Sequence, residues 1–379
     1  MKGKLQDVCE KIVDCPHSTA PDEGKGYPLI RTPNVGRGRL LLDNVQRVSK
    51  EVYDKRNKRA TPQAGDIIFA REAPAGNAAL ICKGQQVCLG QRTVLLRPNL
   101  KLVDPCYLVY YLLDPLQQYK LLGSANGSTV AHVNIPTIKN MFIEIPELNV
   151  QKRIAQIISS YDDFIENSQK QINLLEEALQ RLYKEWFVKL HFPGWKNTQS
   201  IKGIPIKWKE GKLQDIAEFK RGKIITKADV KCGSVPVIAG GINPAYYHDE
   251  ANTKAPVVTI SASGANAGYT SLYPVDIFAS DCLYIDSEST DYVYYVYCFL
   301  KHSSKQIENL QKGSAQPHVY AKDINGLRLL IPNNKYLNLF TDIVSTYFKQ
   351  IQILQRKCIL LSEARDRLLP KLMSGEIEV

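Results

Sequence analysis

A heptad pattern between residues 151 and 186 constrains the fold of this chain more than any other feature. Apolar side chains recur there at alternating steps of four and three residues, with Ser168 as the single polar member: Ile154, Ile158, Tyr161, Ile165, Ser168, Ile172, Leu175, Leu179, Leu182 and Trp186. This spacing predicts a long α-helix with a narrow apolar seam. Such a seam is unstable in water, so the helix needs a partner helix.

The partner helix is predicted within the same chain. At an offset of 186 residues the seam returns, with Arg365 as its one charged member: Phe340, Val344, Tyr347, Ile351, Leu354, Cys358, Leu361, Arg365, Leu368 and Leu372. The same offset relates shorter motifs ahead of each helix: Gly127-Ser128 and Gly313-Ser314, His132-Val133 and His318-Val319, Ile145-Pro146 and Ile331-Pro332. We infer an internal duplication, in which each copy is a globular region followed by a long helix.

The two globular regions share their beginning and differ in their filling. The motif Gly-Lys-Leu-Gln-Asp opens the first at residue 3 and the second at residue 211. Between the shared motifs the regions differ in length and sequence, and both contain strand-like runs such as residues 67–70 and 256–260. The predicted boundaries are a first domain at 1–148, a helix at 149–190, a linker at 191–210, a second domain at 211–334 and a helix at 335–379.

The helix ends are predicted from capping residues and proline. Asn149 is expected to cap the first helix, and Asn333 or Asn334 the second. Pro370 lacks a backbone N–H and crowds the preceding turn. The second helix is therefore predicted to end near Leu369, with the residues beyond it packing from a bent tail.

Charge and cysteine content indicate the kind of partner and compartment. Lys and Arg outnumber Asp and Glu by 49 to 38, and a basic protein of this kind often binds a polyanion. The nine cysteines form no C-x-x-C pair, which is typical of reduced thiols in a cytoplasm. Neither a signal peptide nor an apolar run long enough for a membrane span is expected.

A search for catalytic motifs finds none that is complete. The sequence has no P-loop, no zinc-ligand spacing and no G-x-S-x-G elbow, so we expect neither a catalytic residue nor a metal site. The tetrapeptides at 104–107 (Asp-Pro-Cys-Tyr) and 243–246 (Asn-Pro-Ala-Tyr) lack the second proline of the adenine-methyltransferase motif and are interpreted as turns. His132 and His318 occupy the same frame position, which favours a structural role for both.

A binding surface remains as the main prediction. Arg suits the acceptors of guanine, and Asn or Gln suits adenine, whereas many such side chains instead contact phosphates or solvent. The candidate DNA-binding residues are Arg31, Asn34, Arg37, Arg39, Arg71, Asn77, Gln91 and Arg92 in the first copy, and Arg221, Lys223, Asn243, Tyr246, Ser261, Ser263 and Asn266 in the second.

Several of these stretches carry a family resemblance across the whole chain. They are residues 65–72 with Gln91-Arg92, the run from Ile145-Pro146 into residues 151–155, Trp186-Phe187 ahead of residues 192–194, and the tail at 368–377. With them the chain resembles the specificity subunit of type I restriction-modification systems. The match is specific at the repeats and the tail and weak inside the two fillings.

The resemblance implies a fold and a set of partners. The fold would be α+β, with two target recognition domains separated by two long antiparallel helices in a pseudo-twofold repeat. Each domain would read one half of a bipartite DNA site, and the subunit would have no catalytic site. Two methylation subunits would bring S-adenosylmethionine, and restriction subunits would add ATP- and Mg-dependent translocation and cleavage.

Helix length predicts the gap between the half-sites. From Ile154 to Trp186 an α-helix rises about 48 Å, which corresponds to about 14 base pairs of DNA. Two domains held at the ends of such helices would meet the double helix about one turn apart.

Two other functions stay open at this stage. The chain could be the specificity polypeptide of a related type IIB system with another cutting partner, or a self-contained adenine-N6 methyltransferase. The missing cofactor loop argues against the methyltransferase. A purely structural coiled coil would not need two diverged globular fillings.

Overall fold

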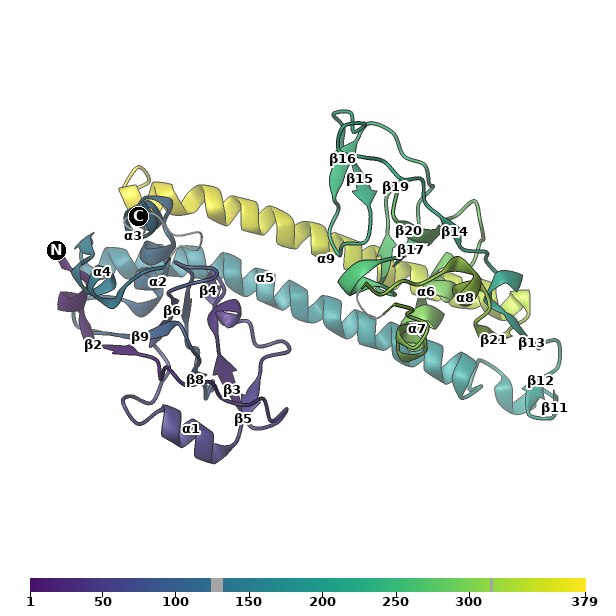
Figure 1. Cartoon of the computed structure of the whole chain (residues 1–379), viewed down its shortest axis with the longest axis horizontal. Helices are drawn as coiled ribbons and strands as arrows, with labels where there is room; N and C mark the ends of the chain where they lie inside the picture. Colours follow the sequence, from purple (N-terminus) through teal and green to yellow (C-terminus); the bar gives the residue numbers. More distant parts are fainter. Residues whose placement is uncertain (124–131, 314–315) are drawn as a thin grey trace. The chain divides into compact units, whose positions relative to one another are not determined.

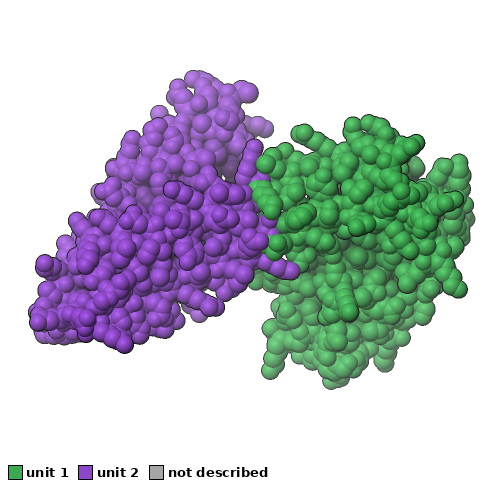
Figure 2. Space-filling model, turned by 180° about the vertical axis from the view of Figure 1, so that it is seen from behind, with its two compact units in different colours: residues 1–167, 357–379 green, residues 168–356 purple. Residues whose placement is uncertain are grey.

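The computed structural model describes residues 1–123, 132–313 and 316–379. The chain divides into two compact units, shown in Figure 2. Unit 1 comprises Met1–Asn167 and Lys357–Val379, and unit 2 comprises Ser168–Arg356. Each unit therefore contains one globular region together with part of both long helices.

Unit 1 is built on a five-stranded sheet in the order β2-β9-β6-β7-β4, with a three-stranded sheet β5-β3-β8 and a ribbon β1-β10 beside it. Its strands are β1 Lys2–Lys4, β2 Cys9–Asp14, β3 Tyr27–Ile30, β4 Gly38–Arg39, β5 Arg47–Val48, β6 Ile67–Ala70, β7 Ala78–Leu80, β8 Cys88–Leu89, β9 Thr93–Pro98 and β10 Phe142–Glu144. Its shorter helices are α1 Lys50–Arg56, α2 Pro105–Leu113, α3 Pro115–Gly123 and α4 Ile135–Asn140.

Unit 2 carries a four-stranded sheet in the order β14-β20-β17-β18, a three-stranded sheet β16-β15-β19 and the ribbons β13-β21 and β11-β12. Its strands are β11 Ser200–Ile201, β12 Ile204–Pro205, β13 Lys209–Lys212, β14 Lys220–Arg221, β15 Val235–Ile238, β16 Tyr246–His248, β17 Val257–Ser261, β18 Thr270–Tyr273, β19 Phe278–Ala279, β20 Cys282–Ile285 and β21 Arg328–Ile331. Its shorter helices are α6 Val293–His302, α7 Ser304–Glu308 and α8 Ala321–Asn325.

The duplication inferred from the sequence is visible in strand register. The opening motif of each copy pairs antiparallel with the strand that precedes its long helix, so Gly3 lies opposite Ile143 and Gly211 opposite Leu329. In both motifs the aspartate carboxylate accepts a hydrogen bond at 2.8 Å from the backbone N–H of the lysine three residues before it. Each unit thus has an equivalent two-stranded ribbon, β1-β10 in unit 1 and β13-β21 in unit 2, that joins the start of the copy to the strand before its long helix. Of the repeat motifs, Gly127, Ser128 and Ser314 lie outside the described residues.

The two long helices, α5 (Leu148–Tyr183) and α9 (Asn334–Ser374), pack together in opposite directions (Figure 1). In unit 1 the beginning of α5 shares a core with the end of α9, where Ile158 and Leu372 are both buried. In unit 2 the end of α5 meets the beginning of α9, where the ring of Tyr183 lies 6.3 Å from that of Phe340. Every position of the two predicted seams is buried or half-buried.

Two predictions about helix ends are wrong, and one is confirmed. Asn149 lies inside α5, because the carbonyl of Glu147 already accepts the helical bond from Gln151. Asn333 caps α9, since its side chain accepts from the N–H of Tyr336.

The predicted end of the second helix near Leu369 is also wrong, because α9 continues through Pro370 to Ser374. Proline removes one backbone donor from the helix. Leu369 and Leu372, on either side of it, are both buried in the core of unit 1. Burying two leucine side chains gains roughly 3 kcal/mol or more, which offsets a penalty of about the same size.

Candidate nucleic-acid interface

Four chain segments of unit 1 meet where β6 ends and β9 begins. Ala70, the last residue of β6, pairs with Thr93, the first of β9. Beyond this pair, the backbone N–H of Arg71 donates to the carbonyl of Arg92 at 2.9 Å. The N–H of Val133 donates in turn to the carbonyl of Arg71 at 3.0 Å. The edge thereby gathers the side chains of residues 71, 72, 92 and 132 beside the end of β2.

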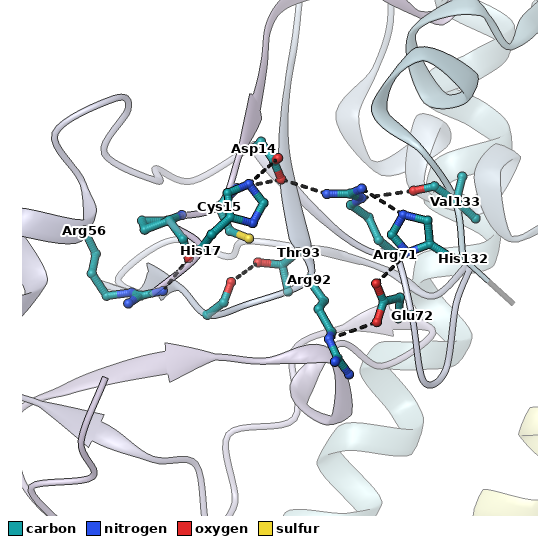
Figure 3. Close-up of polar contacts among 12 residues, drawn as sticks. Asp14, Cys15, His17, Arg56, Arg71, Glu72, Arg92, Thr93, His132 and Val133 are labelled. Atoms are coloured by element: carbon teal, nitrogen blue, oxygen red, sulfur yellow. Dashed lines mark hydrogen bonds and ion pairs between the residues drawn. The ribbon is translucent and has the colours of Figure 1, made fainter. Parts of the chain in front are cut away.

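These side chains form one continuous chain of hydrogen bonds (Figure 3). Arg71 donates to the Asp14 carboxylate at 3.1 Å and contacts Nε2 of His132 at 3.0 Å. Nδ1 of His132 contacts one oxygen of Glu72, and Nε of Arg92 contacts the other at 2.9 Å. The polar chain, defined as Asp14, Arg71, His132, Glu72 and Arg92, therefore alternates donors and acceptors throughout.

The geometry of this chain fixes the tautomer of His132. A guanidinium has only donors, so Nε2 of His132 must accept the bond from Arg71. The proton then lies on Nδ1, from which the ring donates to Glu72. His132 thus bridges a buried arginine and a carboxylate.

The two arginines of the polar chain have different environments. Arg71 is only 9% exposed, and its guanidinium also donates to the carbonyl of Val133 at 3.0 Å. The side chain of Arg92 is 60% exposed. Arg71 therefore holds the site together from inside, whereas Arg92 is open to a ligand.

The loop after β2 borders the same edge. Nε2 of His17 lies 3.1 Å from the second oxygen of Asp14, and Gln91 donates to the carbonyl of His17 at 3.2 Å. Arg56 donates to three backbone carbonyls, at residues 16, 18 and 89, and fastens the loop to β8. Burial raises the pKa of the Cys15 thiol, which keeps it protonated and unsuited to nucleophilic chemistry.

Unit 2 has the same frame at the corresponding edge. Ser261, the last residue of β17, pairs with Cys282, the first of β20. The N–H of Val319 donates to the carbonyl of Ala262, as that of Val133 does to Arg71. The backbone of His318 forms an isolated antiparallel β-bridge with Ser263, as the backbone of His132 does with Glu72. By this register Ser263 corresponds to Glu72.

The polar residues within this shared frame differ. Asp281 directly precedes β20, and Arg92 directly precedes β9. Arg221 pairs with the second residue of β20, and Asp14 pairs with the second residue of β9. One oxygen of Asp281 accepts from Arg221 at 3.0 Å, and the other accepts from the Ser263 hydroxyl at 2.6 Å. The position before the central strand therefore has Arg92 in unit 1 and Asp281 in unit 2. The position on the neighbouring strand has Asp14 in unit 1 and Arg221 in unit 2.

Other predicted binding residues of unit 1 lie around β4 and at the start of β7. The side chain of Asn34 accepts a hydrogen bond from the N–H of Arg31 and donates one to the carbonyl of residue 41. The side chain of Asn77 donates to the carbonyl of residue 35. Arg39 bonds Cys82 and Asp163, and Arg37 donates to the carbonyl of residue 113. Arg31 and Arg37 are exposed, whereas the two asparagines serve to shape the turn.

The remaining candidates of unit 2 divide in the same way. Ser261 is buried and donates to the carbonyl of Gly240 at 2.9 Å, so its hydroxyl is occupied. Asn266 and Tyr246 are half-buried, the latter in β16. Lys223 and Asn243 are exposed.

Sequence reasoning missed three acidic residues of the two edges, Asp14, Glu72 and Asp281, and the neighbouring His17. Acidic side chains do not complement phosphate or the acceptors of guanine, so residue chemistry alone does not point to them. The strand register that aligns the two copies would have pointed to Asp281, but register is a property of the fold. The Asp104 tetrapeptide is a helix start, since its carboxylate accepts from the N–H of Tyr107.

The described residues include no group of three or more His, Cys, Asp or Glu side chains that could hold a metal ion. Among the described helices, none is both long and apolar enough to cross a membrane.

Comparison with known proteins gives matches over nearly the whole chain. The family described as type I restriction modification DNA specificity domain matches residues 1–177 and again 205–361. A type I restriction enzyme specificity subunit of Methanocaldococcus jannaschii, MjaIX, is 26% identical over 408 residues, covering 99% of this chain and 93% of the relative. A putative type I specificity subunit of Mycoplasma genitalium is 26% identical over 299 residues, covering 74% of this chain and 75% of the relative.

The fold is also shared with a solved structure. The crystal structure of a type I restriction-modification S subunit from M. genitalium superposes with a TM-score of 0.60 at 18% identity, covering 98% of this chain and 95% of that one. The two separate family matches coincide with the two copies of the internal repeat.

Proposed function

Because this chain belongs to the type I restriction-modification DNA specificity family, we propose that its two units each read one half of a bipartite double-stranded DNA site. Family membership makes the chain the DNA specificity subunit of such a system, which is the non-catalytic part of the complex. The observation that carries the proposal is the shared frame with two different polar sets, around Glu72 in one unit and Asp281 in the other. Two identical sets of polar residues would recognise identical half-sites, whereas these two different sets would recognise two different half-sites.

The charge of the chain supports DNA as the ligand. A formal net charge of +11 favours a polyanion, and the exposed residues Arg31, Arg37, Lys223 and Asn243 lie in loops of the two globular regions. Side chains of these types contact both phosphates and base edges. The buried or occupied candidates, such as Arg71 and Ser261, would instead hold the reading edges in shape.

The long helices would set the gap between the half-sites. Each contributes residues to both units, so the number of helical turns between the recognition regions would set the gap. We assign residues 1–148 and 211–334 as target recognition domains, with 149–190 and 335–379 as spacer helices and 191–210 as the linker.

The catalytic functions would reside in partner subunits. Two methylation subunits would bring S-adenosylmethionine, and restriction subunits would bring ATP and Mg, in a cytoplasmic complex without membrane contact. The nine cysteines, all unpaired, are compatible with a reducing compartment.

An exposed apolar group on the helices of unit 1 is suited to docking a methylation subunit. Phe164 of α5 and Ile359 and Leu360 of α9 are about half exposed. They lie near one level of the helix pair, where the thiol of Cys358 contacts the carbonyl of Ile165 at 3.8 Å. An amphipathic helix of the partner would cover such side chains through an apolar stripe.

A domain exchange tests the division into two readers. Replacing residues 213–326 with the corresponding segment of a relative that has another specificity leaves β13, β21 and both helix seams intact. The methylated adenines in DNA treated with the reconstituted complex should then change in one half-site and keep the other half-site and the gap. The reciprocal exchange, of residues 5–140, is the matched control. A change in both half-sites from a single exchange would overturn independent reading.

A further inference from the structure

Arg92 ends the polar chain of unit 1 with its outer nitrogens directed away from its carboxylate partner (Figure 3). Glu72 holds Nε at 2.9 Å, and neither Nη1 nor Nη2 has a partner among the residues that the structure describes. The guanidinium is planar, so fixing Nε restricts the directions in which the Nη donors can point. Arg92 is therefore a pre-oriented donor, unlike a freely rotating surface arginine.

The backbone of Arg92 supports a functional reason for this residue. Its φ angle is 64°, in the left-handed region that glycine adopts without cost. A residue with a Cβ is unfavourable there, and such conformations concentrate at functional sites. Stability alone would favour glycine at this position, so the arginine side chain needs a separate purpose.

Unit 2 also has an exposed arginine beside a carboxylate, at different strand positions and held through an Nη nitrogen rather than through Nε. The side chain of Arg221 is 57% exposed, and one of its Nη nitrogens contacts Asp281 at 3.0 Å. Asp281 is anchored by the Ser263 hydroxyl, as Glu72 is anchored by His132. Each unit thus presents one exposed arginine, held by a carboxylate that a second residue holds in place.

We propose that Arg92 and Arg221 are the base-reading residues of the two half-sites, each donating to the O6 and N7 acceptors of a guanine. Glu72 and Asp281 are their positioning residues. Guanine is the base that offers two adjacent acceptors in the major groove. The inference rests on the proposed function, in which each unit reads one half-site. A pair of phosphate oxygens would match the same donors, and the experiment separates the two ligands.

The test uses the full-length chain in its complex with the methylation subunit and a library of DNA duplexes randomised in sequence. Selection with the unchanged protein defines two half-site motifs and their gap. The variants are Arg92→Gln, Arg92→Lys and Arg221→Gln, with Arg59→Gln as the control. Arg59 is an exposed arginine of unit 1 outside the polar chain, so its loss removes the same charge.

The expected result is a local loss of base preference. Arg92→Gln should reduce the preference for guanine at one position of one half-site by roughly 5- to 100-fold and leave the other half-site unchanged. Arg221→Gln should do the same in the other half-site. Arg92→Lys keeps the charge and removes the two-pronged donor, so it should lose the preference while keeping the salt dependence of binding.

Glu72→Gln tests the positioning role. It should weaken the same guanine preference as Arg92→Gln, although Arg92 is still present, and it should leave the other half-site unchanged. A folding defect would lower binding to every sequence, so the position-specific readout distinguishes the two roles. Unchanged motifs in the Glu72 variant would overturn its assignment as a positioning residue.

Two outcomes would overturn the base-reading assignment. Uniformly weaker binding to all sequences, with a salt slope smaller by about one, would make the arginine a phosphate contact. If the arginine variant changes binding no more than Arg59→Gln does, the arginine contacts neither a base nor a phosphate. Failure of the proposed function is distinguishable, since the unchanged protein would then select fewer than two half-site motifs.

Discussion

Asp162 of α5 and Arg365 of α9 form an ion pair within the helix seam of unit 1. Asp162 is only 5% exposed, and its other oxygen accepts from the hydroxyl of Tyr110 in α2 at 2.5 Å. At the repeat offset of 186 residues, the position of Asp162 in unit 2 is Phe348, which stacks on Tyr294 of α6 at 4.7 Å. One copy thus joins its globular region to the helices by a hydrogen-bonded ion pair, and the other by aromatic packing.

Removing one partner of this pair should destabilise unit 1. Arg365→Leu leaves Asp162 buried with a single neutral donor, and we expect a loss of about 3 kcal/mol in the free energy of unfolding. The double variant Asp162→Leu/Arg365→Leu should recover part of it, because neither buried charge then remains and only the Tyr110 hydroxyl loses its partner. Denaturant unfolding provides the measurement, with exposed Arg367→Leu as the control. Equal stability of Arg365→Leu and the unchanged protein would contradict the expectation.

Binding to DNA should weaken steeply with salt. Basic side chains that neutralise phosphates release condensed counterions, so contact with six to ten phosphates should lower the affinity by roughly 10³- to 10⁵-fold between about 50 and 200 mM salt. The measurement is a titration of a duplex carrying the recognised site, with a nonspecific duplex for comparison. A flat plot of log affinity against log salt would show that the basic surface does not contact DNA.

Lengthening the helix pair should lengthen the preferred gap. One heptad added to α5 between Ser168 and Ile172, and one to α9 between Leu354 and Cys358, keeps both seams apolar and in register. The added rise is roughly 10 Å, or about three base pairs. Binding to a series of sites that differ only in gap length measures the shift. A heptad in α5 alone, which breaks the register, is the control, and an unchanged optimum in a folded double insertion would assign the spacing to another element.

Alkylation at neutral to mildly alkaline pH should modify the exposed Cys232 before the less accessible cysteines. All nine cysteines lie in described ranges, and Cys232 is the exposed one. Burial raises the pKa of Cys88 to about 11 and of Cys9, Cys106 and Cys282 to about 12. At pH 8 roughly one in a thousand or fewer of these thiols is the reactive thiolate.

Iodoacetamide at pH 8 should therefore label Cys232 first, and should label Cys9, Cys88, Cys106 and Cys282 only after unfolding. Mass spectrometry of peptides from timed samples measures this order. Cys232→Ser should abolish the early label. Early labelling of Cys88 or Cys282 in the folded protein would mean that their burial is incomplete.

The apolar group on the helices of unit 1 should matter for assembly rather than for folding. Phe164→Gln with Leu360→Gln should weaken binding of the methylation subunit by about tenfold or more, since each removes apolar area worth about 1 kcal/mol or more. Thermal unfolding of the isolated chain should change little, because both side chains already face solvent. Gln169→Ala, an exposed change on α5, is the control. Undiminished assembly would place the docking surface elsewhere.

Local and periodic features of this protein were predictable from sequence. The seams follow from repeated spacing of side chains such as Ile158 and Val344, and spacing along one helix requires no knowledge of the fold. The duplication was visible for the same reason, since a constant offset is a property of the sequence. The cap at Asn333 was predicted correctly because capping bonds span only three residues.

The errors arose where packing overrides local preference. The sequence predicts a helix end near Leu369, because proline disfavours helix interiors. In the structure α9 continues, since Leu369 and Leu372 are buried in the core of unit 1. The DNA-binding role predicted for Arg71 stays a prediction, and the fold adds contacts that the sequence did not show. Its guanidinium contacts Asp14, His132 and the carbonyl of Val133.

The sequence by itself determined that the chain has two copies of one frame, a helix in each and different fillings between shared motifs. Only the tertiary structure decided which residues of the fillings correspond. Asp281 matches Arg92, and Arg221 matches Asp14, through the register of strands far apart in the chain. Strand pairing is set by the packing of the whole sheet, so it leaves no periodic signal in either strand. For that reason the carboxylate that holds Arg92 and the one that holds Arg221 became visible only in the folded chain, although both arginines were candidates from the sequence.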